Sequence, residues 1–136
     1  MAAITFPADM AFVAHGIGFV ANRAAAEGFS PEGIARIELA VEEALVNICQ
    51  HAYLDSAGTV EIRCHQGETQ NILIEFIDTG ESFNVLEQPL PDLEVALEQR
   101  PVGKLGILLI RSLVDVVTYR REANRNILQL AVQRGR

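Results

Sequence analysis

Tryptophan is absent from this 136-residue chain, aromatic residues make up 6% of it, and it contains two cysteines. The two cysteines, Cys49 and Cys64, are too few for a disulfide scaffold and lack the paired spacing of a zinc site. No apolar run approaches the ~20 residues of a membrane-spanning helix, and the opening MAAITFPADM lacks the cationic region of a signal peptide. We therefore expect a cytoplasmic protein rather than a secreted or membrane-embedded one.

Basic residues are also scarce, because 11 Lys and Arg stand against 18 Asp and Glu, which gives a formal net charge of −7 and a pI of about 4.9. A surface this acidic repels nucleic-acid phosphates, so we expect neither a nucleic acid nor a membrane among the partners. Hydrophobic residues make up 49% of the chain and charged residues 21%, which suits a packed core and not a disordered chain. No linker or repeat divides the sequence, which predicts a single domain over residues 1–136.

Apolar periodicity and capping residues predict helices followed by strands. Asp9 and Ser30 are suited to cap the first two helices, and Gly28 is suited to end the first. The polar segment 78–103 has one weakly helical stretch, at 93–99. The predicted helices cover 9–27, 31–54 and 105–114, and the predicted strands cover 4–6, 59–64, 71–77, 116–121 and 127–133, the last two joined through 122–126. This order predicts an α/β fold, a two-layer sandwich in which helices cover one face of a mixed β-sheet.

The second predicted helix carries the first chemical signal. Its apolar residues form two faces, which predicts a helix wedged between neighbours, with its polar stripe facing a cleft. Glu43, Asn47 and His51 are each four residues apart, so they stack on that stripe. A solvated helix face is the alternative, because such spacing is common. The two apolar faces consist of Ile34, Ile37, Val41, Leu45 and Ile48, and of Ala35, Leu39, Val46 and Tyr53.

Two glycine-containing segments support a site beside this stripe. Asp78-Thr79-Gly80 follows a predicted strand, where the carboxylate is a fixed acceptor and the glycine leaves room for a flat ring to approach the backbone. Gly103-Lys104-Leu105-Gly106 begins a predicted helix, where free N–H groups, the helix dipole and a lysine favour phosphate. Taken singly, the two segments could be an ordinary turn and a flexible hinge.

Three segments together resemble the GHKL superfamily of gyrase, heat-shock chaperones, histidine kinases and MutL. ELAVEEALVNICQHAY at 38–53 resembles its N-box, IDTGESFN at 77–84 its first glycine box, and PVGKLGILLIRSLVD at 101–115 its second. Within the superfamily, the chain is similar to the small anti-sigma-factor serine kinases of the RsbW type. Two residues depart from the wider pattern: Ser82 replaces a second glycine, and Lys104 stands where a small or polar residue is usual.

The resemblance implies a site for ATP and Mg²⁺. It implies that Asp78 accepts from the adenine amino group, that Gly80 lets the ring lie close, and that Glu43 is the catalytic base. Asn47 would hold the Mg²⁺ that bridges the phosphates, because this hard ion takes few protein ligands. For His51 a structural hydrogen bond is favoured over catalysis. The phosphates would be wrapped by the second glycine box, Gly103, Lys104, Leu105 and Gly106.

The activity implied by the resemblance is that of an ATP-dependent serine/threonine-protein kinase of the anti-sigma-factor type. Its substrate would be a serine on a STAS-domain anti-sigma-factor antagonist, and a sigma factor and a second copy of the chain are further candidate partners. One alternative is a stand-alone kinase that acts on a STAS protein without holding a sigma factor. Others are a nucleotide-dependent binding module with little phosphotransfer, and a detached histidine-kinase ATPase domain, which the missing phospho-acceptor helix disfavours.

Overall fold

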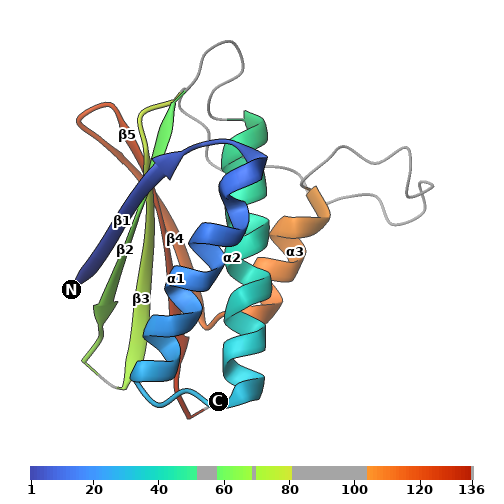
Figure 1. Ribbon diagram of the computed structural model, residues 1–136, viewed down its shortest axis with the longest axis vertical. Helices are drawn as coiled ribbons and strands as arrows, with labels where there is room; N and C mark the ends of the chain where they lie inside the picture. The colour runs from blue at the N-terminus through green and yellow to red at the C-terminus, as the bar shows by residue number, and fades with distance from the viewer. Residues whose placement is uncertain (52–57, 69, 81–103, 136) are drawn as a thin grey trace.

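The computed structural model describes residues 1–51, 58–68, 70–80 and 104–135, with the backbone alone at 51 and 104–107 (Figure 1). The predicted helical stretch at 93–99 and the predicted helix end at 52–54 lie outside the described residues. All the other predicted elements are present, with ends shifted by a few residues. They are β1 (Ala2–Pro7), a 3₁₀ turn (Met10–Phe12), α1 (Val13–Ala26), α2 (Pro31–His51), β2 (Thr59–Gln66), β3 (Asn71–Asp78), α3 (Lys104–Leu113), β4 (Val116–Glu122) and β5 (Arg125–Gln133).

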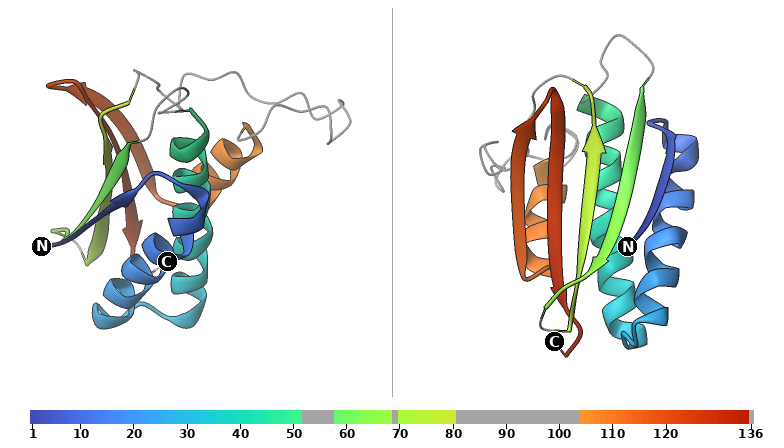
Figure 2. Two further views of the ribbon diagram at one scale, coloured as in Figure 1. Left: turned by 45° about the horizontal axis from the view of Figure 1, so that its top comes forward. Right: turned by 90° about the vertical axis from the view of Figure 1, so that its left-hand side faces the viewer.

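The five strands form one sheet in the order β1-β2-β3-β5-β4, and the three helices lie together on one of its faces (Figures 1 and 2). The predicted two-layer α/β sandwich is therefore confirmed. The sheet is not mixed, however, because every hydrogen-bonded pair of strands is antiparallel. β3 and β4 do run in the same direction, since each is antiparallel to β5, but β5 lies between them and separates the parallel pair.

Short-range hydrogen bonds explain where the first two helices begin and end. Asp9 accepts from the Ala11 N–H at 2.9 Å and so caps the turn that leads into α1. The Ser30 hydroxyl accepts from the Gly33 N–H at 3.1 Å, and proline occupies the first position of α2. Gly28 has a φ of +89°, the left-handed conformation that ends α1. The predicted caps and stop are confirmed.

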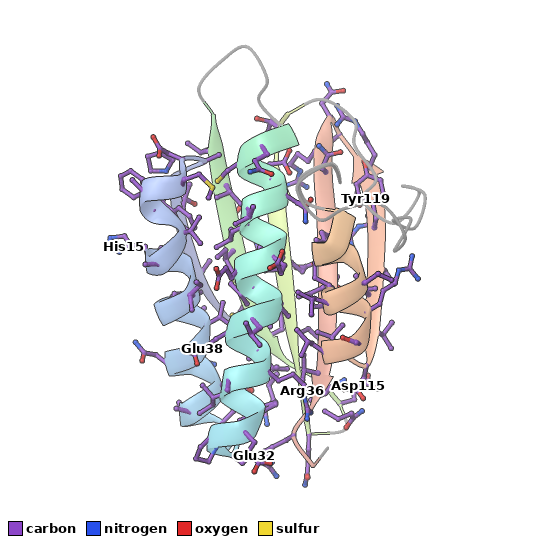
Figure 3. All side chains as sticks on the ribbon, turned by 90° about the vertical axis from the view of Figure 1, so that its right-hand side faces the viewer. His15, Glu32, Arg36, Glu38, Asp115 and Tyr119 are labelled. Carbon is purple, nitrogen blue, oxygen red and sulfur yellow. The ribbon has the colours of Figure 1, made fainter. Side chains whose placement is uncertain are left out.

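The core lies between the sheet and the helical layer, in which α2 runs between α1 and α3 (Figure 3). Leu45 of α2 is fully buried with Ile62 of β2 and Phe76 of β3, and each such side chain contributes roughly 1.5–3 kcal/mol by leaving water. The predicted second apolar face of this helix is wrong in part, because Ala35 is exposed and Leu39 is 49% exposed. Val46 of the same face is half-buried, so this side of the helix is covered only in part.

The β4–β5 hairpin is tighter than the sequence predicted. Its strands pair as far as Glu122 with Arg125, and the two linking residues, Ala123 and Asn124, have φ of +52° and +62°. Two consecutive left-handed residues make the two-residue turn that matches the twist of a hairpin. Asn126, predicted to lie in the connection, therefore belongs to β5 and to the sheet.

Within the described residues, no helix combines the length and the apolar character that crossing a membrane requires.

Candidate functional site

Glu43 and Asn47 lie one helical turn apart on α2, as the sequence predicted. Asn47 is 4% exposed and Glu43 is half-buried. The Asn47 Nδ2 donates to the main-chain oxygen of Glu43 at 2.9 Å, so the amide is held against its own helix. Among the described residues, no hydrogen bond reaches Asn47 Oδ1 or the Glu43 carboxylate. Within the described part of the chain, the Asn47 amide oxygen and the Glu43 carboxylate are thus left without a hydrogen-bond donor. The backbone of His51 lies at the end of the same helix, but its side chain is outside the described part.

Asp78 and Gly80 lie where β3 ends, on the side of the sheet that faces the helices. Asp78 is buried, at 5% exposure, and Gly80 is buried beside it. Asp78 Oδ1 accepts from the Gly80 N–H at 2.9 Å, which folds the glycine box back on its own carboxylate. The other oxygen, Oδ2, has no partner among the described residues. The carboxylate is therefore held at one oxygen and available at the other.

Three residues of the closing hairpin complete this part of the site, and none of them was predicted from the sequence. The register places Asp78 opposite Asn126 and Asn126 opposite Arg121, in one row across β3, β5 and β4. Asn126 is 4% exposed and donates from Nδ2 to Asp78 Oδ1 at 2.9 Å. Its Oδ1 accepts from Arg121 Nη1 at 3.0 Å and from the Tyr119 hydroxyl. Arg121 Nη1 also donates to the Gly80 carbonyl at 3.0 Å, so the hairpin is bonded to the glycine box.

The two acidic residues of the site have perturbed proton affinities. Burial raises the pKa of Asp78, and the hydrogen bonds from Asn126 and Gly80 and the charge of Arg121 oppose that rise. Burial also raises the pKa of Glu43, and the neighbouring carboxylate of Glu42 adds to the effect. A raised pKa makes a carboxylate a stronger proton acceptor, which is the property that a general base needs.

The second glycine box is described only in part. α3 begins at Lys104, so the backbones of Lys104, Leu105 and Gly106 form the first helical turn, whose N–H groups have no partner within the helix. Gly103 lies outside the described residues. Figure 1 shows the start of α3, the end of α2, the end of β3 and the β4–β5 turn at the same end of the molecule. The described parts of the predicted segments thus lie at one end of the sandwich.

The donor set fits a weakly coordinated magnesium ion better than a protein-built metal centre. No group of three or more His, Cys, Asp or Glu in the described chain could hold a metal ion. Asn47 offers an amide oxygen in a buried position, and Mg²⁺ commonly takes one or two protein ligands together with phosphate oxygens and waters.

The histidine kinase-like ATPase domain family matches residues 6–132, which is almost the whole chain. Serine-protein kinase RsbW of Bacillus thuringiensis (strain Al Hakam) is 34% identical over 114 residues, covering 80% of this chain and 68% of the relative. The protein of the same name from Bacillus cereus (strain AH187) is 32% identical over 113 residues, with the same coverage.

Solved structures show the same fold in a histidine kinase. The blue-light activated histidine kinase of Erythrobacter litoralis EL346 aligns with a TM-score of 0.59 at 21% identity, over 87% of this chain and 40% of that one. Its histidine kinase domain aligns with a TM-score of 0.54 at 19% identity, over 90% of this chain and 61% of that one. The chain thus spans less than two thirds of either solved structure, and the likeness concerns the fold alone.

The chain belongs to the histidine kinase-like ATPase domain family, and the predicted membership of the GHKL superfamily is confirmed. Its curated relatives place it among the protein kinases of the RsbW type, and a domain of this kind binds ATP.

Proposed function

We propose that this protein is an ATP-dependent serine/threonine-protein kinase that phosphorylates a serine on a STAS-domain anti-sigma-factor antagonist. The observation that carries the proposal is the pairing of a half-buried carboxylate with raised pKa, Glu43, and a buried amide oxygen one turn away, on Asn47. The names of the relatives support serine as the acceptor.

Adenine binding is assigned to the end of β3. Asp78 Oδ2 accepts from the exocyclic amino group, while Oδ1 stays bonded to Gly80 and Asn126. A carboxylate acceptor in a buried position gives a charge-assisted bond, which is stronger than one between neutral groups. Gly80 presents a backbone with no side chain to the face of the ring.

The phosphates are assigned to the start of α3 and the metal to α2. The N–H groups of Lys104, Leu105 and Gly106 and the helix dipole favour anionic oxygens. We also assign Gly103 and the Lys104 ammonium to phosphate binding, although Gly103 and the Lys104 side chain lie outside the described part of the chain. Asn47 Oδ1 is the protein ligand for Mg²⁺, which when bound neutralises phosphate charge and orients the chain of phosphates.

Phosphoryl transfer needs few protein groups beyond these. The serine oxygen of the partner forms a bond to the γ-phosphorus, the bond from that phosphorus to the β–γ bridging oxygen breaks, and ADP leaves. The serine proton passes to the Glu43 carboxylate, whose burial makes it a better acceptor than an exposed glutamate. Positioning and charge neutralisation supply most of the rate, so one base is sufficient.

A sigma factor is the second proposed partner. If it and the antagonist bind the protein to different degrees with ATP and with ADP bound, linkage requires the nucleotide to select the partner. A kinase that never holds a sigma factor, and a binding module with little transfer, are the competing functions. The open Glu43 carboxylate favours a kinase over a module.

One experiment tests the proposal and separates these functions. The protein is incubated with labelled ATP, Mg²⁺ and a STAS-domain protein encoded beside it, and transfer of the label is measured. Separately, co-purification tests whether the protein binds a sigma factor. We expect label on a serine of the STAS protein. Transfer without sigma binding indicates the stand-alone kinase, and nucleotide-dependent partner binding without transfer indicates the binding module.

A further inference from the structure

Arg121 and Tyr119 lie on the same face of β4 and converge on one atom. Both donate to Asn126 Oδ1, Arg121 through Nη1 at 3.0 Å and Tyr119 through its hydroxyl. A carbonyl oxygen has two lone pairs, so these two donors saturate it. Figure 3 shows Tyr119 on β4, in the layer that lies behind α3 in that view.

Saturation at Oδ1 decides which way the Asn126 amide points. With its oxygen turned toward β4, its NH₂ group must face β3, where Nδ2 meets Asp78 Oδ1 at 2.9 Å. Asp78 Oδ1 therefore accepts from two protein donors, Asn126 Nδ2 and the Gly80 N–H. A proton on this oxygen would face one of those donors, so Oδ1 acts only as an acceptor. Arg121 also holds Gly80 in place, because its Nη1 donates to the carbonyl oxygen of the same residue whose N–H bonds Asp78.

We propose that Arg121 and Tyr119 are positioning residues that set the base specificity of the Asp78 site. They orient Asn126 so that Asp78 is held as an acceptor, with Oδ2 directed at the exocyclic group of the base. The inference rests on the proposed adenine site. The amino group of adenine donates a hydrogen bond to such an oxygen. The carbonyl oxygen of a 6-oxopurine is itself an acceptor, so it repels Asp78 Oδ2, and this mismatch disfavours binding of a 6-oxopurine. Neither residue need touch the nucleotide.

Arg120 provides a matched control. It is the neighbour of Arg121 on β4, so its side chain points to the opposite face of the sheet. There it contacts Glu122 at 3.0 Å and Glu75 at 3.5 Å, away from Asp78. Replacing either arginine removes the same charge from the same strand, and only one replacement disturbs Asn126.

The test is titration of the full chain with ADP and with inosine diphosphate, which carries a carbonyl in place of the amino group. We expect Arg121→Ala to weaken ADP binding about tenfold, and to reduce the preference for ADP over inosine diphosphate by a similar factor. The reason is that the charge-assisted hydrogen bond that orients the Asn126 amide is lost. Tyr119→Phe, which keeps the ring, should shift the preference in the same direction by a few fold. Arg120→Ala should leave both affinities unchanged.

The outcomes separate this inference from the proposed function. If the unmodified protein binds neither nucleotide, the adenine site itself is wrong. If it prefers ADP and the preference survives both Arg121→Ala and Tyr119→Phe, the site stands and the positioning role is overturned. Equal losses of affinity for ADP and inosine diphosphate would also overturn it, because they indicate a structural role. Thermal melts identify a variant that does not fold, and Tyr119→Phe then decides.

Discussion

The side chain of Asn47 is bonded to the main-chain oxygen of Glu43, 2.9 Å away on the preceding turn of α2. This bond uses Nδ2 and so directs Oδ1 away from the helix, where it is available as an oxygen ligand. The same relationship places the two side chains that we assign to metal binding and proton transfer on one buried side of one helix. Their separate replacement should therefore have different consequences.

Asn47→Ala should weaken binding of Mg-ADP by about ten- to a hundredfold, because a metal ligand is lost. Metal-free ADP should bind the variant and the unmodified protein nearly equally. Excess Mg²⁺ should restore part of the loss. The measurement is titration with ADP in the presence of a chelator and at rising Mg²⁺ concentrations. Equal weakening with and without Mg²⁺ would show that Asn47 does not serve the metal.

Asp78→Asn should weaken ADP binding by ~1.5–3 kcal/mol, about ten- to a hundredfold, because a charged acceptor is lost. The donors from Gly80 and Asn126 should keep the new amide oxygen in the Oδ1 position, which turns its NH₂ group toward the adenine amino group. Titration measures the effect, and thermal melts check the fold.

For the unmodified protein, ADP at about 100 times its Kd should add ~2.7 kcal/mol of stability and raise the Tm by several degrees.

The rate of phosphoryl transfer should depend on pH through Glu43. Burial and then Glu42 raise its pKa above the ordinary 4.5, so the base becomes protonated, and the rate falls, as pH drops through that raised value. The effect on stability has the opposite sign. The folded form holds the proton more tightly than the unfolded form, so this contribution to stability is present at low pH and is lost as pH rises through the same window.

Glu42→Ala should move the acid limb of the rate profile to lower pH, since it removes the neighbouring negative charge. Single-turnover rates across the acid range for the unmodified protein and for Glu42→Ala test both statements. An acid limb that Glu42→Ala leaves in place, or moves to higher pH, would mean that another group limits the rate.

Two glycines of α1 should respond in opposite ways to alanine. At Gly16 a Cβ would meet Leu45 at 2.6 Å, Phe6 at 2.9 Å and Ile62 at 3.0 Å, so Gly16→Ala should destabilise the fold by about 1–3 kcal/mol. At Gly18 a Cβ would meet nothing within 4 Å, and Gly18→Ala should stabilise the helix by about 0.5–1 kcal/mol. Denaturant unfolding of the two variants measures the difference. Similar effects at both positions would contradict the packing of α1.

Most of the fold could be predicted because its signals are local. The caps at Asp9 and Ser30, the stop at Gly28 and the alternation of the strands all depend on neighbours in sequence. The antiparallel sheet could not be predicted in the same way, because it depends on β5 inserting between β3 and β4. The exposure of Leu39 likewise depends on which side of α2 the sheet lies.

The residues of the candidate site that are close in sequence could be predicted, and those brought together by strand pairing could not. Glu43 and Asn47 are recognisable from helical spacing, and Asp78 and Gly80 from a strand end. Asn126 is 48 residues from Asp78, and its partnership comes from strand register alone. Asn124 is the sequence signal that could have placed Asn126 in β5. Asparagine tolerates the left-handed conformation, so a two-residue turn at Ala123 and Asn124 could have been predicted.

The most direct test of the kinase mechanism compares two neighbouring glutamates of α2. Glu42 is exposed, Glu43 is half-buried, and the two point about 100° apart on the helix. Single-turnover transfer from labelled ATP to a STAS-domain serine is measured for Glu43→Ala and Glu42→Ala, with ADP affinity measured alongside. We predict that Glu43→Ala lowers transfer by ~10²–10⁴ with ADP affinity nearly intact, and that Glu42→Ala near neutral pH lowers neither. Full transfer by Glu43→Ala would contradict Glu43 as the base, and loss of transfer in Glu42→Ala alone would assign that role to the neighbouring residue.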